Sequence, residues 1–534
     1  MYMHKLTSEV VSDYTSNIVN TEAGKVRGVK VDSTYIFRGI RYAEAERFAM
    51  PHKVQPWEGV RDAFDYGYCA PELNTPIPHD QFYVPHYFYP QDDACQYLNI
   101  WTQHINDGAK RPVMVWIHGG GWFSGSGIEI YSYDGENLSV FKDVVVISLN
   151  HRLNVLGYLN LSAYGEKYAN SANAGLADLV AALQWIHDNI AGFGGDPDNV
   201  TIFGQSGGGS KVISLMQTPA ADGLYHKAII QSGGVNHPNK SLAAAEEESR
   251  YMAERVVHYG GSPEELEKLD FYDLAEATGK AIWDFKQKYG KTYRWQPIAN
   301  DWFAGHPFDS SYRKETMNIP MLVGNVFGEF RNNYLLRIGE GHKNQWSEEY
   351  KLEMIRSFYG DAADRVICAF KHAYPGRNLA DCLFFDKGHR AGCLEFSTDR
   401  AKLGGTVYNW LFDLEAPFFG GTVPWHNAEE PYVFHNVQYI EAQYEPGVSE
   451  TLQDLMAAAW VQFAETGNPN IPGLPVWEKV TPEHVPTMIF DRLCYSTVDH
   501  DKELVEAVPV VQSGMSLGNG KAVYAEGINP EVSD

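Results

Sequence analysis

A serine flanked by glycines is the first feature of this sequence that can do chemistry. The stretch "VTIFGQSGGGSKV", residues 200–212, places Ser206 between Gly204 and Gly208, directly after an apolar run. In a G-x-S-x-G turn the glycines permit a tight strand-to-helix connection that exposes a strained serine. The backbone N–H after the serine then points to where an oxyanion forms. The pattern favours a catalytic nucleophile at Ser206.

Two other interpretations of these glycines stay open at this point. A phosphate-binding loop needs a lysine directly after its last glycine to reach the phosphates, followed by a hydroxyl for the magnesium ion. Here Ser210 precedes Lys211, so the lysine comes one position late. The third interpretation is a plain glycine-rich connection between a strand and a helix.

A second glycine-rich stretch favours the catalytic interpretation. "WIHGGGW", residues 116–122, places three glycines at the end of another apolar run and upstream of Ser206. It is similar to the HGGG motif that supplies oxyanion N–H donors in lipases and esterases. Backbone without side chains can approach a tetrahedral intermediate closely. The two stretches together indicate a serine hydrolase.

A nucleophilic serine needs a base, and the base needs a carboxylate to orient it. In α/β-hydrolases these follow the serine in the order acid, then histidine, each after a strand. "VFGEF" offers Glu329 and "GGTVPWHNAEEPYVF" offers His426. By position alone, Asp301 and Asp309 compete with Glu329, and His435 competes with His426.

Short apolar runs must form the framework that positions these residues. Continuous β-branched and aromatic runs of this length are typical of strands buried on both faces of a parallel sheet. Between two of them, apolar residues recur at spacings of three and four over residues 173–195, which predicts a helix. Strand and helix in alternation predict an α/β fold. The apolar runs are "VMVWIHGGG", "VVVISLN", "VTIFGQS", "KAIIQSGG", "IPMLVGN" and "TVYNWLFDL".

The chain is interpreted as one domain over residues 1–534. About residues 240–400 are helix-rich, charged and amphipathic with a single sheet-like run inside, so we expect helical insertions packed over the sheet. The last residues, about 512–534, read as a loose tail.

Composition limits the classes of partner. The 44% hydrophobic and 21% charged residues are values of a folded globular protein, and the net charge of −25 disfavours nucleic acid or anionic membrane as a partner. The N-terminal stretch lacks the apolar region of a signal peptide, which predicts a cytoplasmic protein unless a leader has been removed. Six cysteines without a CxxC pair indicate neither a disulfide scaffold nor a metal site, and we expect no cofactor.

These stretches, in this order, resemble the type-B carboxylesterase family, which includes bacterial para-nitrobenzyl-type esterases, animal carboxylesterases and cholinesterases. The resemblance covers about residues 17–495. It is carried by "FRGIRYAEAERFAMPHKVQPWEGVRDAFDYGYCAPE", "DDACQYLNIWT", "VWIHGGGWFSGSG", "VVVISLNHRLNVLGYLN", "NAGLADLVAALQWIHDNIAGFGGDPDNVTIFGQSGGGS", "HKAIIQSGG", "IPMLVGNVFGEF" and "HNAEEPYVF".

The resemblance implies the α/β-hydrolase fold, with a central, mostly parallel sheet flanked by helices and with helical insertions over the active site. It implies Ser206 as nucleophile, His426 as general base and then acid, and Glu329 as the carboxylate that orients the imidazole. It further implies oxyanion N–H donors and one supporting serine behind the triad, namely Gly120, Gly121, Gly207 and Ser232.

The sequence departs from the family pattern close to these residues. Gln205 and Gly207 flank the nucleophile where the family commonly has glutamate and alanine. Glu329 is followed by Phe330 in place of the usual glycine, which makes Glu329 the triad member least supported by its surroundings. Asn427 follows His426 where the family favours glycine.

Cys69 and Cys95 fall where secreted relatives form a disulfide, so the resemblance makes them a candidate pair. Such a bridge would add roughly 3 to 4 kcal/mol of stability, whereas a cytoplasmic chain would keep it reduced. The loop between them has no tryptophan, unlike the choline-binding loop of cholinesterases, which disfavours a quaternary ammonium substrate. Its aromatic residues either line an apolar gorge entrance or pack the loop onto the body: Phe82, Tyr83, Tyr87, Phe88 and Tyr89.

The expected function is hydrolysis of a small-molecule carboxylic ester through an acyl-enzyme, by a monomer or small homo-oligomer. One alternative is an esterase specialised for bulky aromatic acids, such as feruloyl esters. Another is a catalytically silent, neuroligin-like interaction protein, although such relatives typically lack the nucleophile.

Overall fold

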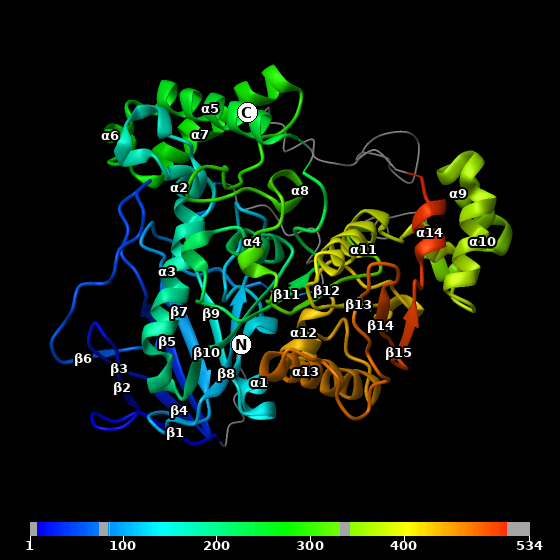
Figure 1. Ribbon diagram of the computed structural model, residues 1–534, viewed down its shortest axis with the longest axis horizontal. Helices are drawn as coiled ribbons and strands as arrows, with labels where there is room; N and C mark the ends of the chain where they lie inside the picture. Colours follow the sequence, from blue (N-terminus) through cyan, green and yellow to red (C-terminus); the bar gives the residue numbers. More distant parts are fainter. Residues whose placement is uncertain (1–7, 74–83, 85, 239, 332–341, 510–534) are drawn as a thin grey trace, which may run out of the picture.

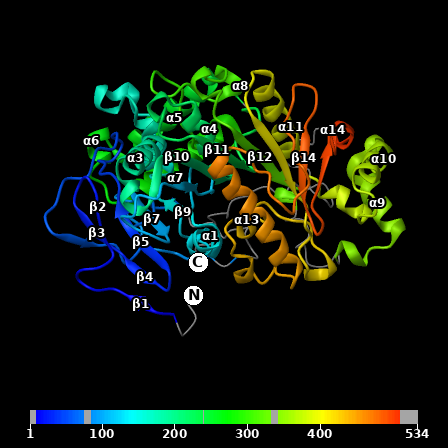
Figure 2. The ribbon, with the colours of Figure 1, turned by 60° about the horizontal axis from the view of Figure 1, so that its bottom comes forward.

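The protein is built on one large twisted sheet (Figures 1 and 2). Within the described part of the chain it has twelve strands, in the order β1-β4-β5-β7-β9-β8-β10-β11-β12-β13-β14-β15. The computed structural model describes residues 8–73, 84, 86–238, 240–331 and 342–509. The aromatic residues Phe82 and Tyr83 and the tail at 512–534 lie outside the described residues.

The centre of the sheet is parallel. Its neighbouring strands are β9 (Val145–Leu149), β8 (Arg111–Ile117), β10 (Gly195–Gln205), β11 (Lys227–Gln231), β12 (Met321–Val326), β13 (Val407–Phe412) and β14 (Pro486–Phe490). Each of the six apolar runs in the sequence forms one of these strands. The predicted parallel α/β sheet is therefore confirmed, and the carboxyl ends of its strands meet along one edge.

Antiparallel strands extend the sheet on both sides, and the sequence patterns did not predict them. They are β1 (Val10–Val11), β4 (Val29–Val31), β5 (Thr34–Arg41) and β7 (Tyr97–Thr102) at one edge and β15 (Tyr495–Val498) at the other. A small separate sheet joins β2 (Ile18–Asn20), β3 (Lys25–Arg27) and β6 (Val60–Asp62).

Helices cover both faces of the sheet, because alternate side chains of each central strand point to opposite sides. On β8, Val113 and Val115 pack into the core under α3 (Ala174–Asn189) and α4 (Gly207–Met216). Met114 and Trp116 pack into a second core under α13 (Val448–Thr466). The helix predicted from the spacing of apolar residues is α3.

The helices of the helix-rich region at 240–400 form two groups. The helices α5 (Leu242–Gly260), α6 (Pro263–Leu266) and α7 (Phe271–Tyr289) pack with α2 (Asn154–Tyr158). The helices α9 (Glu348–Tyr359) and α10 (Ala363–Ala373) pack with α14 (Lys502–Ala507) at the far side of the molecule (Figure 1). Strand β12 and helix α11 (Lys387–Lys402) lie between them in sequence, and both belong to the central layers. The remaining α-helices of the described residues are α1 (Glu136–Lys142), α8 (Pro307–Ser310) and α12 (Glu430–Val433).

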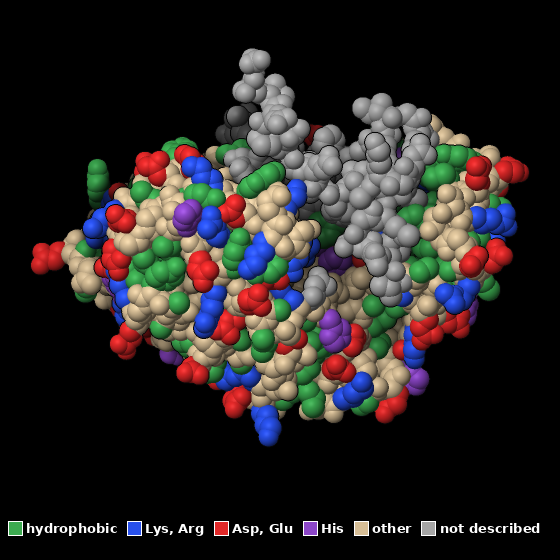
Figure 3. Space-filling model, turned by 90° about the horizontal axis from the view of Figure 1, so that it is seen from above, with side chains coloured by type: hydrophobic (Ala, Val, Ile, Leu, Met, Phe, Trp, Pro, Cys, Tyr) green, Lys and Arg blue, Asp and Glu red, His purple; other side chains and the backbone are tan. Residues whose placement is uncertain are grey.

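Acidic and basic side chains intermingle over the face shown in Figure 3.

Within the described ranges, every helix is too short or too polar to cross a bilayer.

Candidate active site

Ser206 lies at the turn between β10 and α4, at the carboxyl edge of the sheet. Its φ of 56° and ψ of −120° are strained for a residue with a side chain. A Cβ atom on Gly204 would lie 2.6 Å, and one on Gly208 2.0 Å, from the carbonyl oxygen of Ile117. Only glycines therefore fit on either side of the serine, as the nucleophile interpretation requires.

The glycine loop after β8 lies against this turn. Gly120 and Gly121 have φ values of 76° and 60°, which favour glycine. A Cβ atom on Gly119 would lie 3.5 Å from Cβ of Ser206, so the loop borders the serine. Within the described ranges, the N–H groups of Gly120 and Gly121 have no backbone acceptor, and that of Gly207 opens α4, where no intrahelical acceptor exists. Three neighbouring N–H groups are thus available to bind an anion.

The departure from alanine at Gly207 has a steric cause. A Cβ atom on Gly207 would lie 2.4 Å from both the nitrogen and the oxygen of Gly121. Both contacts are with backbone, which cannot move aside without shifting the loop. In this chain the glycine loop therefore approaches the Ser206 turn more closely than an alanine at position 207 permits.

His426 and Glu329 lie together at the same edge of the sheet. Nδ1 of His426 hydrogen-bonds Oε2 of Glu329, whose Oε1 accepts a 2.9 Å bond from the N–H of Val326. Both side chains are buried, and Glu329 has a left-handed φ of 40°. Nε2 of His426 is buried and has no hydrogen-bond partner among the described residues, Ser206 included. The histidine is thus fixed on one side and open on the other.

The competing residues do not share this environment. Asp301 and Asp309 are exposed. His435 is bonded through Nε2 to Asp454 at 2.7 Å and stacks on Phe141. The geometry therefore favours Glu329 and His426 over the alternatives that spacing left open.

Phe330 is a contact that sequence reasoning missed. Its ring lies 3.8 Å, centroid to centroid, from the imidazole of His426. The signal was present in the sequence as the departure from glycine after Glu329. The aromatic side chain covers one face of the imidazole and restricts its rotation.

Two glutamines tie the serine turn to the histidine loop. The side-chain amide of Gln205 donates to the carbonyl oxygen of His426. The main-chain carbonyl of Gln231 accepts a 2.8 Å hydrogen bond from the N–H of Ser206. Its side-chain amide donates a 3.1 Å hydrogen bond to the carboxylate of Glu429. A carboxylate at position 205 has no proton to donate, so glutamine suits this chain where the family commonly has glutamate.

Ser232 lies directly behind Ser206. It is buried, has a φ of 52°, and donates its N–H to the carbonyl of Gly324 at 2.8 Å. A Cβ atom on the next residue, Gly233, would lie 1.8 Å from the carbonyl oxygen of Ser206. The hydroxyl of Ser232 has no hydrogen-bond partner in the described part of the chain. The structure thus places this serine beside the turn, and its supporting role stays a prediction.

Comparison with known families agrees with this arrangement. The model of the carboxylesterase family matches residues 15–495. The chain belongs to the carboxylesterase family. The phosphate-loop interpretation is therefore wrong.

Relatives of this carboxylesterase are hydrolases. Para-nitrobenzyl esterase of Bacillus subtilis is 29% identical over 92% of this chain and 97% of its own. Carboxylesterase 3B of Mus musculus is 33% identical over 86% of this chain and 84% of its own. A solved structure, an esterase from anaerobic Clostridium hathewayi that can hydrolyse aliphatic aromatic polyesters, is 42% identical with a TM-score of 0.86 and covers 94% of this chain and 99% of that one. The fold is thus the α/β-hydrolase fold of these esterases.

The candidate disulfide of this carboxylesterase is not formed in the structure. Cys69 and Cys95 are both buried free thiols. The thiol of Cys69 accepts a hydrogen bond from the amide of Asn150 at 3.6 Å, and burial raises its pKa to about 12. Both side chains therefore pack as small neutral groups.

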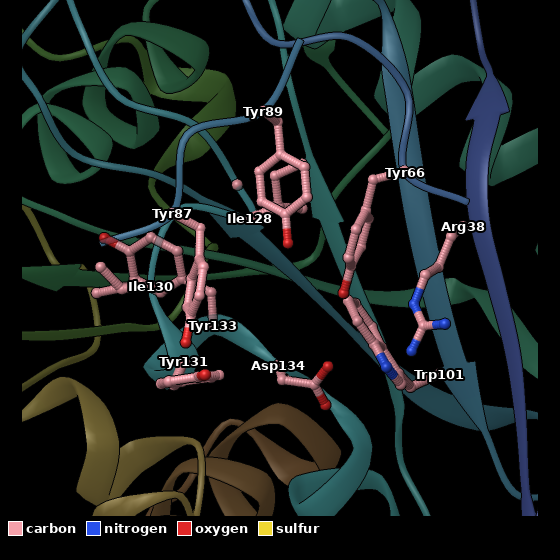
Figure 4. Close-up of a pocket in the computed structure, with 11 residues that line it drawn as sticks. Arg38, Tyr66, Tyr87, Tyr89, Trp101, Ile128, Ile130, Tyr131, Tyr133 and Asp134 are labelled. Atoms are coloured by element: carbon pink, nitrogen blue, oxygen red, sulfur yellow. The ribbon is translucent and has the colours of Figure 1, made fainter. Parts of the chain in front are cut away.

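Tyr87 and Tyr89 of the aromatic loop line a separate pocket. It has a volume of about 300 Å³, and no candidate catalytic residue lines it (Figure 4). Tyr87 packs edge-on against Tyr131 and Tyr89 against Tyr66, whereas Phe88 is exposed. Of the described members of the loop, Tyr87 and Tyr89 therefore pack onto the body, which supports the packing interpretation for these two residues.

His389 of α11 is the third titratable group beside the pair. One ligand atom each from Glu329, His389 and His426 lie within 4.8 Å of one another, a spacing that a metal ion can bridge. Both oxygens of Glu329 are already engaged. Burial lowers the pKa of His389, but the carboxylates of Glu329 and Asp386 outweigh it and hold the pKa at about 9. A metal would have to displace this proton, so a cationic His389 fits the cluster better.

The charge on His389 predicts a pH dependence of stability. Folding raises the pKa of His389 from 6.5 to about 9. The protonated imidazole therefore stabilises the folded state fully below pH 6.5, and this stabilisation is lost as the pH rises through about 9. Between these values the wild type should lose on the order of 2 to 3 kcal/mol relative to His389→Gln. Denaturant unfolding of both proteins across this range measures the difference; a constant difference contradicts the assignment.

Proposed function

We propose that this carboxylesterase hydrolyses carboxylic esters through an acyl-enzyme on Ser206, with His426 and Glu329 completing the triad. The observation that carries the proposal is the imidazole of His426. Glu329 holds its Nδ1, and its buried Nε2 has no partner among the described residues at the edge of the sheet where Ser206 lies. A base held in this way has one open nitrogen for the serine proton.

The proposed reaction has two steps. Oγ of Ser206 attacks the ester carbonyl while Nε2 of His426 takes its proton, and the N–H groups of Gly120, Gly121 and Gly207 hold the oxyanion. The intermediate collapses, the alcohol leaves with the proton from His426, and the acyl group stays on Ser206. Water then attacks the acyl-enzyme, His426 takes and returns a proton again, and the carboxylic acid is released.

Membership of the carboxylesterase family and the hydrolase activity of its relatives support an enzyme and not a catalytically silent interaction protein. The serine, histidine, carboxylate and glycine loop of the resemblance are all retained, whereas silent relatives typically lack the nucleophile. We propose a cytoplasmic enzyme acting as a monomer or small homo-oligomer on the basis of sequence alone.

A second candidate is an esterase that prefers aromatic acids. It is favoured by the 42% identical Clostridium hathewayi esterase, which can hydrolyse aliphatic aromatic polyesters. If this preference extends to the present chain, para-nitrophenyl benzoate should be cleaved with a kcat/KM within about tenfold of that for the acetate.

A matched series of para-nitrophenyl acetate, butyrate and benzoate, with methyl ferulate as a different alcohol, tests both candidates. Hydrolysis of the aliphatic esters with benzoate more than about a hundredfold slower supports a general carboxylesterase and contradicts the aromatic preference. If the enzyme cleaves none of these esters, the proposed function is contradicted.

A further inference from the structure

Lys211 is a buried lysine beside the glycine loop. It lies in the second turn of α4, five residues after Ser206, and its side chain has no exposed surface. Its ammonium donates to two main-chain carbonyls of the glycine loop, His118 at 2.9 Å and Gly119 at 3.3 Å. Burying a cation costs several kcal/mol in a protein interior unless its hydrogen bonds compensate.

The loop surrounds this side chain on more than one side. The ring of Trp122, at the far end of the glycine triplet, lies 5.9 Å from Nζ of Lys211. Nδ1 of His118 also contacts the carbonyl oxygen of Gly119, at 3.0 Å. Lys211 and His118 therefore both contact the carbonyl oxygen of Gly119, the residue before Gly120.

That carbonyl determines where the proposed oxyanion donor points. The carbonyl of Gly119 and the N–H of Gly120 belong to one planar peptide, and no described peptide bond is cis. In a trans peptide the C=O and N–H groups point in opposite directions. A carbonyl held toward Lys211 therefore directs the N–H of Gly120 away from Lys211. Glycines have no side chain that could hold this plane by packing.

We infer that Lys211 is a positioning residue that holds the Gly119–Gly120 peptide so that its N–H serves the oxyanion hole. The inference rests on the proposed function, because it requires that an oxyanion forms at Ser206. This role explains why Lys211, which stands one position too far along the sequence for a phosphate-binding loop, is buried behind the glycines.

The electrostatic surroundings agree with a side chain that acts through hydrogen bonds. Burial lowers the pKa of Lys211 to about 7, and the carboxylate of Glu129 limits this fall. His118 and His151 stack at 5.1 Å beside it, and burial together with Lys211 holds the pKa of both well below 6.5. Protonated or neutral, the amine keeps N–H groups to donate to the two carbonyls.

The test is Lys211→Met, which keeps an unbranched apolar side chain and removes the donors. We expect kcat for para-nitrophenyl acetate to fall about 10- to 100-fold with KM changed less than about threefold, because one donor is misdirected and not deleted. The affinity for a trifluoromethyl ketone, which forms an oxyanion on Ser206, should fall by the same factor as kcat/KM.

Lys227→Met is the matched control. Lys227 is also a buried lysine with a pKa lowered by burial, to about 8, but it lies on β11 and donates to Asn199. This variant should keep the wild-type kcat and ketone affinity. If Lys227→Met loses both as Lys211→Met does, a general effect of removing a buried lysine explains the loss and the inference is overturned.

Lys211→Gln covers the case in which Lys211→Met does not fold. The shorter amide reaches the carbonyls less well, so kcat and ketone affinity should fall together by about 3- to 10-fold. Unchanged ketone affinity in a folded Lys211 variant overturns the inference. The failure of the proposed function is distinct, because the ketone would then not inhibit the wild type either.

Discussion

Ser206→Ala is expected to remove about a millionfold of kcat on para-nitrophenyl acetate, the largest loss that any single change in this chain should cause. Without Oγ no acyl-enzyme forms, and His426 has no hydroxyl to deprotonate. Alanine keeps the Cβ atom in the narrow turn between Gly204 and Gly208, so the fold should be retained. Initial rates at saturating ester, compared with the uncatalysed rate, measure the effect.

Stability provides the control for this variant. The side-chain hydroxyl of Ser206 makes no hydrogen bond within the described ranges, so its loss should leave the midpoint of denaturant unfolding within experimental scatter of the wild type. An unfolded variant would make the rate loss uninformative. A folded variant that retains turnover contradicts the role of Ser206.

Glu329→Gln is expected to lower kcat by about ten thousandfold. The carboxylate holds the proton of His426 on Nδ1 and leaves Nε2 as the base. An amide offers an N–H in place of one oxygen, which favours the tautomer with the proton on Nε2, and that tautomer cannot accept the serine proton. Rates on para-nitrophenyl acetate at about pH 7.5 measure the loss.

Glu429→Gln is the matched control for Glu329→Gln. Burial, and to a smaller extent the nearby charge of Glu329, raises the pKa of Glu429 to about 8. Glu429 is therefore mostly neutral at pH 7, and glutamine resembles its protonated form. We expect kcat within about threefold of the wild type at this pH. Equal losses in the two variants would contradict a specific role for Glu329.

The centre of the fold could be predicted because its strands are buried on both faces. Such strands are continuous apolar runs, as in β8 and β13, and are visible without knowledge of their neighbours. The antiparallel strands β1 and β4 were missed for the opposite reason. They are two and three residues long and not fully buried, so no continuous apolar run marks them.

The same division applies to the site. Ser206 and the glycine loop are marked by local backbone requirements, which glycine spacing reveals. Glu329 and His426 lie 97 residues apart, and only the sheet brings them into contact. Spacing alone therefore left Asp301 and His435 in competition. The role proposed for Lys211 depends on which carbonyls its ammonium reaches, and the sequence does not contain that information.

Ser206 is proposed as the nucleophile, activated by His426. Brief reaction with diethyl para-nitrophenyl phosphate, followed by mass spectrometry of proteolytic peptides, tests it most directly. We predict complete loss of esterase activity and a single diethylphosphoryl group on Ser206, absent from Ser206→Ala. An unlabelled Ser206 in the inactivated enzyme, or full activity after Ser206 is labelled, would contradict the account.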